Sequence, residues 1–118
     1  MAAGPRPLSV TLIACLYLLV GALGLAVHFH EFLTRQPDWG WIVLTEALAV
    51  LIGIFLLRGQ NWARWLAIAW IAFHVGLSVH GPVRALILHT AFLALITWAL
   101  FHAAARRYFR SSVAASTL

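Results

Sequence analysis

The sequence predicts an all-α membrane protein, an antiparallel bundle of four transmembrane helices. Of its 118 residues, 64% are hydrophobic and only 9% are charged, whereas about a quarter of the residues of a soluble domain are charged. The mean hydropathy is correspondingly high, at +0.95. The apolar residues also fall into four stretches, each close to the ~20 residues that an α-helix needs to cross a bilayer.

The four predicted spans follow one another with short connections. We predict them over residues 8–30, 41–57, 62–80 and 83–104. Because they use most of the chain, we expect a single integral membrane domain over residues 1–118 with no separate soluble module. The polar tail 111–118 has too little apolar content to pack and is expected to be disordered.

The connections and the helix ends support these boundaries. A polar segment at 34–40, a turn at 58–61 and a tight turn at Gly81-Pro82 separate the spans, and short loops make sequential helices antiparallel neighbours. Tryptophan rings prefer the headgroup level of a membrane. The chain places them at the expected borders, as Trp39, Trp41, Trp62, Trp65 and Trp98.

Cys15 lies inside the first span and is the only cysteine, which excludes an intrachain disulfide. Residues 12–15, Leu-Ile-Ala-Cys, are similar to a bacterial lipobox, in which the cysteine is lipidated after cleavage. The apolar run continues from Leu16 to Val27, however, where a lipoprotein turns polar. We therefore expect an uncleaved first helix rather than a signal peptide.

The arginines predict the orientation in the membrane. With the N-terminus in the cytoplasm, only Arg35 and Arg84 lie outside and six arginines lie inside, in accordance with the positive-inside rule. Both termini are therefore predicted to be cytoplasmic, in a multi-pass protein of a bacterial inner membrane. The basic residues that give the net charge of +5 lie at the ends of the predicted helices. The expected partner is therefore the lipid bilayer and not nucleic acid. The six inside arginines are Arg6, Arg58, Arg64, Arg106, Arg107 and Arg110.

Each predicted span carries one ionisable residue at a similar depth in the outer half: His28, Glu46, His74 and His89. At 1.5 Å per residue, Glu46 lies ~7 Å below the start of the second span, and His74 and His89 each lie ~10 Å from the turn between the third and fourth spans. Ionisable groups are expensive in hydrocarbon and mark a functional site by default.

Small residues indicate which helix faces point inward, because close helix contacts in membranes select them. His28, Glu46 and His74 each share a helical stripe with small residues, whereas His89 shares one only with Thr97 as a sign of interior polarity. The small residues on these stripes are Ala14, Gly21 and Gly24; Ala49 and Gly53; Ala63, Ala67 and Ser78.

The chemistry of this set of side chains leaves several functions open. Three imidazoles and a carboxylate form a ligand set for a transition metal, Zn, Fe or Cu, with Glu46 as fourth ligand or catalytic general base. Two of the histidines are alternatively axial ligands of heme b. The same groups suit proton binding, or they only hold the helices together by hydrogen bonds. His30, His80 and His102 are expected at the interfaces. Glu31 is expected to be a solvated loop charge, with the orientation of His28 as the alternative.

From this site we predict a small inner-membrane protein that binds a metal or heme and serves redox, quinone-linked or lipid-linked chemistry. Whether it is an enzyme is left open by the sequence. One alternative is an accessory or structural subunit of a larger membrane complex or homo-oligomer. Another is a proton-coupled transporter, in which Glu46 and the histidines relay protons.

The turn before the third span carries a resemblance. Residues 59–64, Gly-Gln-Asn-Trp-Ala-Arg, match a G-x-x-W-A-R pattern that resembles small four-span bacterial integral membrane proteins of uncharacterised function. Arg6-Pro7 before the first span is similar to the beginnings of those proteins. The resemblance implies a four-span topology, with an interfacial tryptophan and a cytoplasmic arginine, and it implies no activity.

Overall fold

The structure, a computed structural model, describes the backbone of residues 5–116 and the side chains of residues 5–110. The described chain is helical with short connections and no strand. Its elements are α1 (Leu8–Val27), α2 (Phe29–Thr34), α3 (Trp39–Leu57), α4 (Asn61–Ser78), α5 (Val83–Phe101) and α6 (Ala103–Ser116). The all-α prediction is confirmed.

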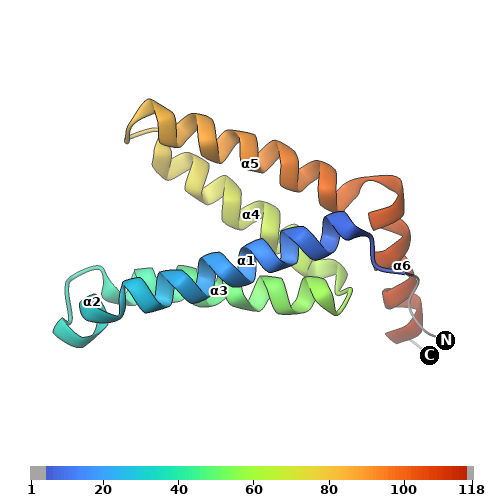
Figure 1. Cartoon of the computed structure of the whole chain (residues 1–118), viewed down its shortest axis with the longest axis horizontal. Helices are drawn as coiled ribbons and strands as arrows, with labels where there is room; N and C mark the ends of the chain where they lie inside the picture. The colour runs from blue at the N-terminus through green and yellow to red at the C-terminus, as the bar shows by residue number, and fades with distance from the viewer. Residues whose placement is uncertain (1–4, 117–118) are drawn as a thin grey trace.

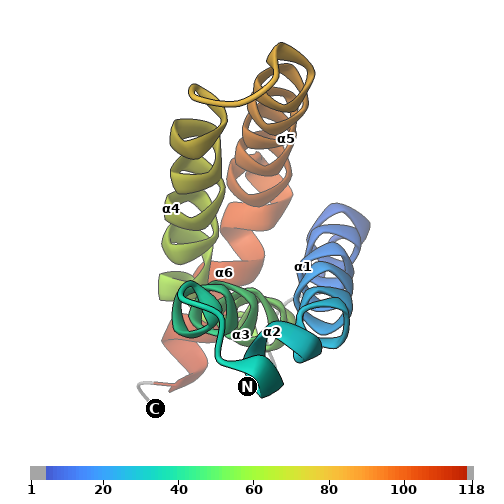
Figure 2. The same ribbon diagram turned by 90° about the vertical axis from the view of Figure 1, so that its left-hand side faces the viewer.

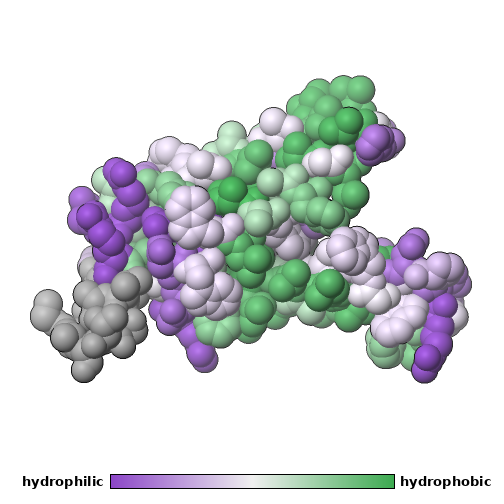
Figure 3. All heavy atoms as spheres, turned by 180° about the vertical axis from the view of Figure 1, so that it is seen from behind, coloured by the Kyte–Doolittle hydropathy of each residue, from purple (hydrophilic) through white to green (hydrophobic). Residues whose placement is uncertain are grey.

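Three helices, α1, α3 and α5, are long and apolar enough to span a membrane, which indicates a membrane protein. The helix α4 has 18 residues, but Asn61, Arg64, His74 and its tryptophans lower its hydropathy. Space-filling views agree with a membrane protein, since polar residues lie at the two ends and an apolar surface lies between them (Figure 3). The coarse prediction of an apolar helical membrane protein is therefore confirmed.

The helices form two pairs that meet at one end and diverge toward the other. Helix α1 packs along α3, and α4 packs along α5. Figure 1 shows the two pairs joined near α6 and separated at the opposite end, where α2 and the α4–α5 turn lie, and Figure 2 shows the same separation from the side. We call the joined end, with α6, the inner end and the divergent end the outer end.

Close contact between α1 and α3 depends on glycine. A Cβ at Gly21 would lie 2.7 Å from the carbonyl oxygen of Glu46, and one at Gly53 would lie 2.8 Å from the carbonyl oxygen of Ala14. Real Cβ atoms do not approach other atoms so closely, so only glycine lets these two backbones pack at this distance. The stripes of small residues predicted for the first two spans therefore pack against each other.

Hydrogen bonds to backbone carbonyls tie the two pairs together. The Tyr17 hydroxyl of α1 donates to the carbonyl of Ala67 in α4 at 2.6 Å, and the Trp70 indole N–H of α4 donates to the carbonyl of Thr45 in α3 at 2.9 Å. At the inner end, Arg6 and Tyr108 both donate to the carbonyl of Leu57. That carbonyl is at the C-terminus of α3, where helix carbonyls lack intrahelical partners.

Two predicted spans are longer than the helices that form them. The first, predicted to residue 30, is interrupted at His28, after which α2 caps the outer end and stops at Arg35 in the left-handed conformation (φ 51°). The fourth, predicted to residue 104, ends at Phe101 because His102 is extended (ψ 169°), and α6 leaves in a new direction.

The tail also differs from its prediction. Residues 111–116, predicted to be disordered, continue helix α6, while residues 117–118 of the same prediction lie outside the described part of the chain. The apolar side of this helix explains the difference. Ala105, Tyr108 and Phe109 are buried against the inner end, so α6 is anchored by packing that the apolar content of the tail alone does not reveal.

Candidate functional site

The four predicted site residues form two separate pairs and not one cluster. His28 at the end of α1 lies near Glu46 of α3, and His74 of α4 lies near His89 of α5, with ring centroids 6.1 Å apart. Within the described residues, no three His, Cys, Asp or Glu side chains come close enough to hold a metal ion. The predicted four-ligand centre of His28, Glu46, His74 and His89 is therefore not formed, because the helix pairs that carry its halves diverge.

The first pair lies in the α1–α3 interface near the outer end. The Glu46 carboxyl packs against Gly24, at a position that a Cβ there would occupy. Its Oε2 atom and the Nδ1 atom of His28 are both buried without a hydrogen-bond partner among the described residues. His28 Nδ1 lies 3.5 Å from Glu31 Oε1, so the alternative for Glu31, a position beside His28, is the one found.

Glu31 itself lies in α2, outside the predicted spans. Its pKa is lowered from the ordinary 4.5, first because its own backbone N–H donates a hydrogen bond to the carboxylate and then because His28 lies beside it. Both effects favour the charged form of the carboxyl group. Glu31 is therefore an anionic residue in the first turn of α2, where the helix dipole favours negative charge.

In the second pair, hydrogen bonds fix the tautomers of both histidines. His74 Nδ1 lies 2.9 Å from the carbonyl oxygen of Trp70, one turn earlier. A carbonyl only accepts, so Nδ1 of His74 carries the proton. Its Nε2 atom is therefore left with a lone pair.

Ser78 determines the tautomer of His89 by the same reasoning. The Ser78 hydroxyl has one proton, which it donates to the carbonyl oxygen of His74 at 2.7 Å. The Oγ atom also lies 2.5 Å from His89 Nδ1; with the hydroxyl proton on the carbonyl, Oγ accepts from His89, which then carries its proton on Nδ1. The Nε2 atom of His89 is left as an acceptor with no partner within the described part of the chain.

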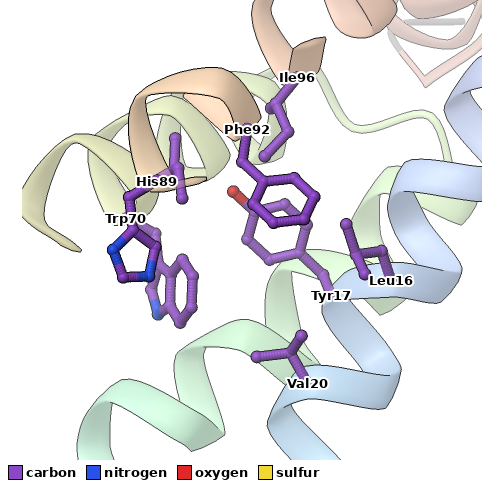
Figure 4. Close-up of a pocket in the computed structure, with 8 residues that line it drawn as sticks. Leu16, Tyr17, Val20, Trp70, His89, Phe92 and Ile96 are labelled. Carbon is purple, nitrogen blue, oxygen red and sulfur yellow. The ribbon is translucent and has the colours of Figure 1, made fainter. Parts of the chain in front are cut away.

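The His89 side chain borders an apolar crevice between the two helix pairs (Figure 4). The crevice has a volume of about 120 Å³, similar to the ~150 Å³ of a cavity that binds benzene. Tyr17 lies ~14 Å along α1 from its start, which places the crevice near the middle of a ~30 Å hydrocarbon layer. Its walls are Leu16, Tyr17 and Val20 of α1, Trp70 and Ile71 of α4, and His89, Phe92 and Ile96 of α5.

His89 is the polar contact that the crevice offers. Tyr17 and Trp70 also bring polar atoms, but the hydroxyl and the indole N–H are already bonded to the carbonyls of Ala67 and Thr45. The remaining lining residues are aliphatic or aromatic. A ligand in the crevice would therefore meet hydrocarbon on its sides, with the His89 imidazole as the side chain free to bond to it and the Tyr17 oxygen as a further acceptor.

The residues present do not fit the predicted heme. The crevice beside His89 holds about 120 Å³, and a second pocket beside His28 holds about 210 Å³. Each is nearer the size of one small ring than of a tetrapyrrole. A zinc site needs three or four protein ligands, whereas the His74–His89 pair supplies two.

The other histidines lie away from the crevice. His30 and His80 are exposed near the outer end. His102 lies at the joint between α5 and α6, where its Nε2 is 2.7 Å from Ser9 Oγ and its ring lies beside Trp98. The prediction of these three at the edges of the membrane region agrees with these positions.

The sequence reasoning missed Tyr17 and underrated Trp70 and Ser78. Tyr17 carries a phenolic hydroxyl in the middle of an otherwise apolar helix, and a buried tyrosine hydroxyl needs a partner. That signal could have marked a contact between helices. Thr97, which was the hint of interior polarity in the fourth span, is exposed and bonds only to the carbonyl of Leu93 in its own helix.

No protein-family model, curated protein or solved structure matches this chain. Function is therefore argued from the crevice and its side chains.

Proposed function

We propose that this protein is a four-span membrane protein that binds a lipid-soluble ligand with a hydroxyl or phenol group, such as a quinol, in the crevice between its helix pairs. The observation that carries the proposal is the unengaged Nε2 lone pair of His89 at the edge of an otherwise apolar crevice. It is consistent with the quinone-linked or lipid-linked chemistry expected from the sequence.

The path of the chain supports four spans. Helix α3 ends at the inner end and α5 begins at the outer end, so α4 has to cover the same distance between them (Figure 1). An inner end in the cytoplasm would place six arginines there and two outside, as the positive-inside rule prefers. We therefore assign both termini to the cytoplasm.

The tautomer of His89 specifies the ligand's polar group. Since Nε2 is an acceptor, the ligand should present an O–H or N–H donor. The volume of about 120 Å³ accommodates roughly one six-membered ring. The crevice lies at mid-membrane depth between diverging helix pairs, so a hydrocarbon chain attached to the ring would extend between the lipid tails.

Binding of a short-chain benzoquinol to the purified protein in nanodiscs tests the proposal. Trp70 lines the crevice and stacks on His74, with ring centroids 3.9 Å apart, so tryptophan fluorescence can report occupancy. A neutral hydrogen bond contributes about 0.5–1.5 kcal/mol, so His89→Leu should weaken benzoquinol binding roughly 2- to 12-fold. The matching benzoquinone, which has only acceptors, should bind the parent protein more weakly than the quinol.

His80→Leu is the matched control, because His80 is exposed at the α4–α5 turn. It should leave benzoquinol affinity unchanged. Val20→Trp, which fills the crevice, should abolish binding. Equal benzoquinol affinity in the parent, His89→Leu and Val20→Trp proteins would show that the crevice is not the binding site.

The transporter and accessory-subunit functions stay as alternatives. Glu46 does not line the crevice, so a proton relay through it would be a separate activity. Proton flux into liposomes, compared between the parent and Glu46→Gln, distinguishes the two cases. A large flux that the substitution removes would favour the transporter.

A further inference from the structure

The inner end carries a group of arginines with no acidic side chain beside them among the described residues. Helix α6 leaves α5 at His102 and folds across the inner ends of the other helices (Figure 1). Its buried side chains, Ala105, Tyr108 and Phe109, fix which face it turns to the protein. Arg106, Arg107 and Arg110 are consequently exposed on its other side.

A fourth arginine, Arg64 of α4, is held at the edge of this group. Its guanidinium lies 4.3 Å from the ring centroid of Phe101 and 5.1 Å from that of Phe109. It donates to the carbonyl oxygen of Leu100 and to Asn61. Its Nε is buried with no partner among the described residues, so the stacked guanidinium retains an unused donor.

The charges here repel one another and lack compensation. Arg106 and Arg110 both lie near Arg64, so three like charges are close together. The three acidic residues of the chain, Glu31, Asp38 and Glu46, all belong to the outer half of the molecule. A binding partner that supplies negative charge at the inner end would therefore relieve this repulsion.

We propose that Arg64, Arg106 and Arg110 form a binding site for the phosphate headgroup of an anionic lipid at the inner membrane surface. Guanidinium groups bind phosphate oxygens through paired N–H donors. Amphipathic helices with arginine on the polar side lie in the interface plane and are attracted to anionic lipids. The Arg side chains also share this end with the exposed rings of Trp62, Trp65 and Trp98, which are typical of the headgroup level.

A lipid is favoured over nucleic acid or free phosphate because of this position. Hydrophilic residues at the inner end border the apolar surface of the proposed spans (Figure 3), so lipid headgroups are the phosphates that reach this end without leaving the membrane. The proposal depends on the membrane embedding proposed above, and it is independent of the ligand in the crevice.

Lipid retention by the full chain tests this site. The purified protein is exchanged into mixed micelles with phosphatidylglycerol or with zwitterionic phosphatidylcholine, and the bound lipid is counted by native mass spectrometry. The parent should retain phosphatidylglycerol in preference to phosphatidylcholine. Each arginine removed should lower that preference about fivefold, so Arg106→Gln with Arg110→Gln should lower it roughly 25-fold.

Arg35→Gln with Arg84→Gln is the matched control, since it removes the same charge from the outer end. It should leave the preference intact, and both double variants should keep the helical circular dichroism and the benzoquinol affinity of the parent. Arg64→Lys, which keeps the charge but loses the planar stack, should retain less phosphatidylglycerol than the parent.

Three results would overturn the proposal. The first is equal retention of the two lipids by the parent protein, and the second is an equal loss of preference in the inner and outer double variants. The third is complete displacement of phosphatidylglycerol by millimolar inorganic phosphate or by a short RNA, which would assign the arginines to a soluble partner. If the parent protein does not bind benzoquinol but still prefers phosphatidylglycerol, the proposed crevice ligand is refuted and the proposed lipid site is not.

Discussion

Replacing Gly21 by alanine should separate α1 from α3, whereas the same replacement at Gly76 should be harmless. A Cβ at Gly21 would lie 2.6 Å from Val50 Cγ2, 2.7 Å from the Glu46 carbonyl oxygen and 2.8 Å from the Val50 nitrogen. Two of these are backbone atoms, so no side-chain rotation makes room and the helices must move apart. At Gly76, also within a helix, a Cβ would meet nothing within 4 Å.

The magnitude follows from the difference between the two variants. Both gain the helix propensity of alanine over glycine, about 1 kcal/mol, and this gain cancels in the comparison. What is left is the cost of overpacking at Gly21, about 1–3 kcal/mol. The free energy of unfolding of Gly21→Ala should therefore be lower than that of Gly76→Ala by this amount, roughly a 5- to 150-fold change in the folding equilibrium.

Unfolding in mixed micelles with increasing SDS, followed by tryptophan fluorescence and circular dichroism, measures this difference. Gly53→Ala provides a second variant on the same interface, because its Cβ would lie 2.8 Å from the Ala14 carbonyl oxygen. Equal stability of Gly21→Ala, Gly53→Ala and Gly76→Ala would refute the close packing of α1 on α3.

Three further predictions concern the ties between helices and the site. Tyr17→Phe removes the hydrogen bond to Ala67 and should lower the free energy of unfolding by about 0.6 kcal/mol, measured in the same SDS titration; no change would indicate that this bond does not tie the pairs together. The purified protein should hold no stoichiometric transition metal, because the His74–His89 pair supplies only two ligands; stoichiometric metal that is lost in His28→Ala would instead favour a shared centre. Because the pKa of Glu31 is lowered from 4.5 in the folded protein, its stabilisation of α2 is present above pH 4.5 and is lost as the pH falls through the lower folded value. The rate of amide exchange in residues 31–36, corrected for its intrinsic pH dependence, should therefore rise in that acidic range for the parent but stay constant in Glu31→Gln. The same pH dependence in both proteins would contradict the stabilisation of α2 by Glu31.

The α1–α3 interface was predictable because its signal is local. Gly21 and Gly53 lie on stripes of small residues, and a stripe is visible from spacing along one helix. The sequence does not reveal which stripe meets which. Ala63 and Ala67 of α4 form a comparable stripe, so a symmetrical bundle and two divergent pairs predict the same small residues.

The predicted cluster failed for a related reason. Counting residues along each helix gives the depth of His28, Glu46, His74 and His89, and their similar depths are compatible with one site. Depth does not give the lateral distance between helices. That distance depends on the angle between the helix pairs, which in turn depends on contacts far apart in the sequence, such as Tyr17 with Ala67.

The end of the fourth span carried a signal that hydropathy alone does not capture. From Ala103 onward the apolar run gives way to a pattern in which Ala105, Tyr108 and Phe109 alternate with arginines. This spacing is that of an amphipathic helix at an interface, not of a disordered tail. Reading periodicity beyond the span would have predicted α6, although the break at His102 depends on its contact with Ser9.

The two ionisable pairs differ in which of their polar atoms lack a hydrogen-bond partner once the helices have packed. Glu46 and His28 are enclosed between α1 and α3, and the Glu46 carboxyl fills the space over Gly24. His74 and Ser78 instead donate to the backbone carbonyls of Trp70 and His74, which leaves Nε2 of His89 without a partner among the described residues, on a side chain that lines an apolar crevice. An acceptor without a partner in hydrocarbon is costly. A ligand that donates a hydrogen bond there removes that cost, which is why the crevice, and not the residues with the most charge, is the better candidate for a binding site.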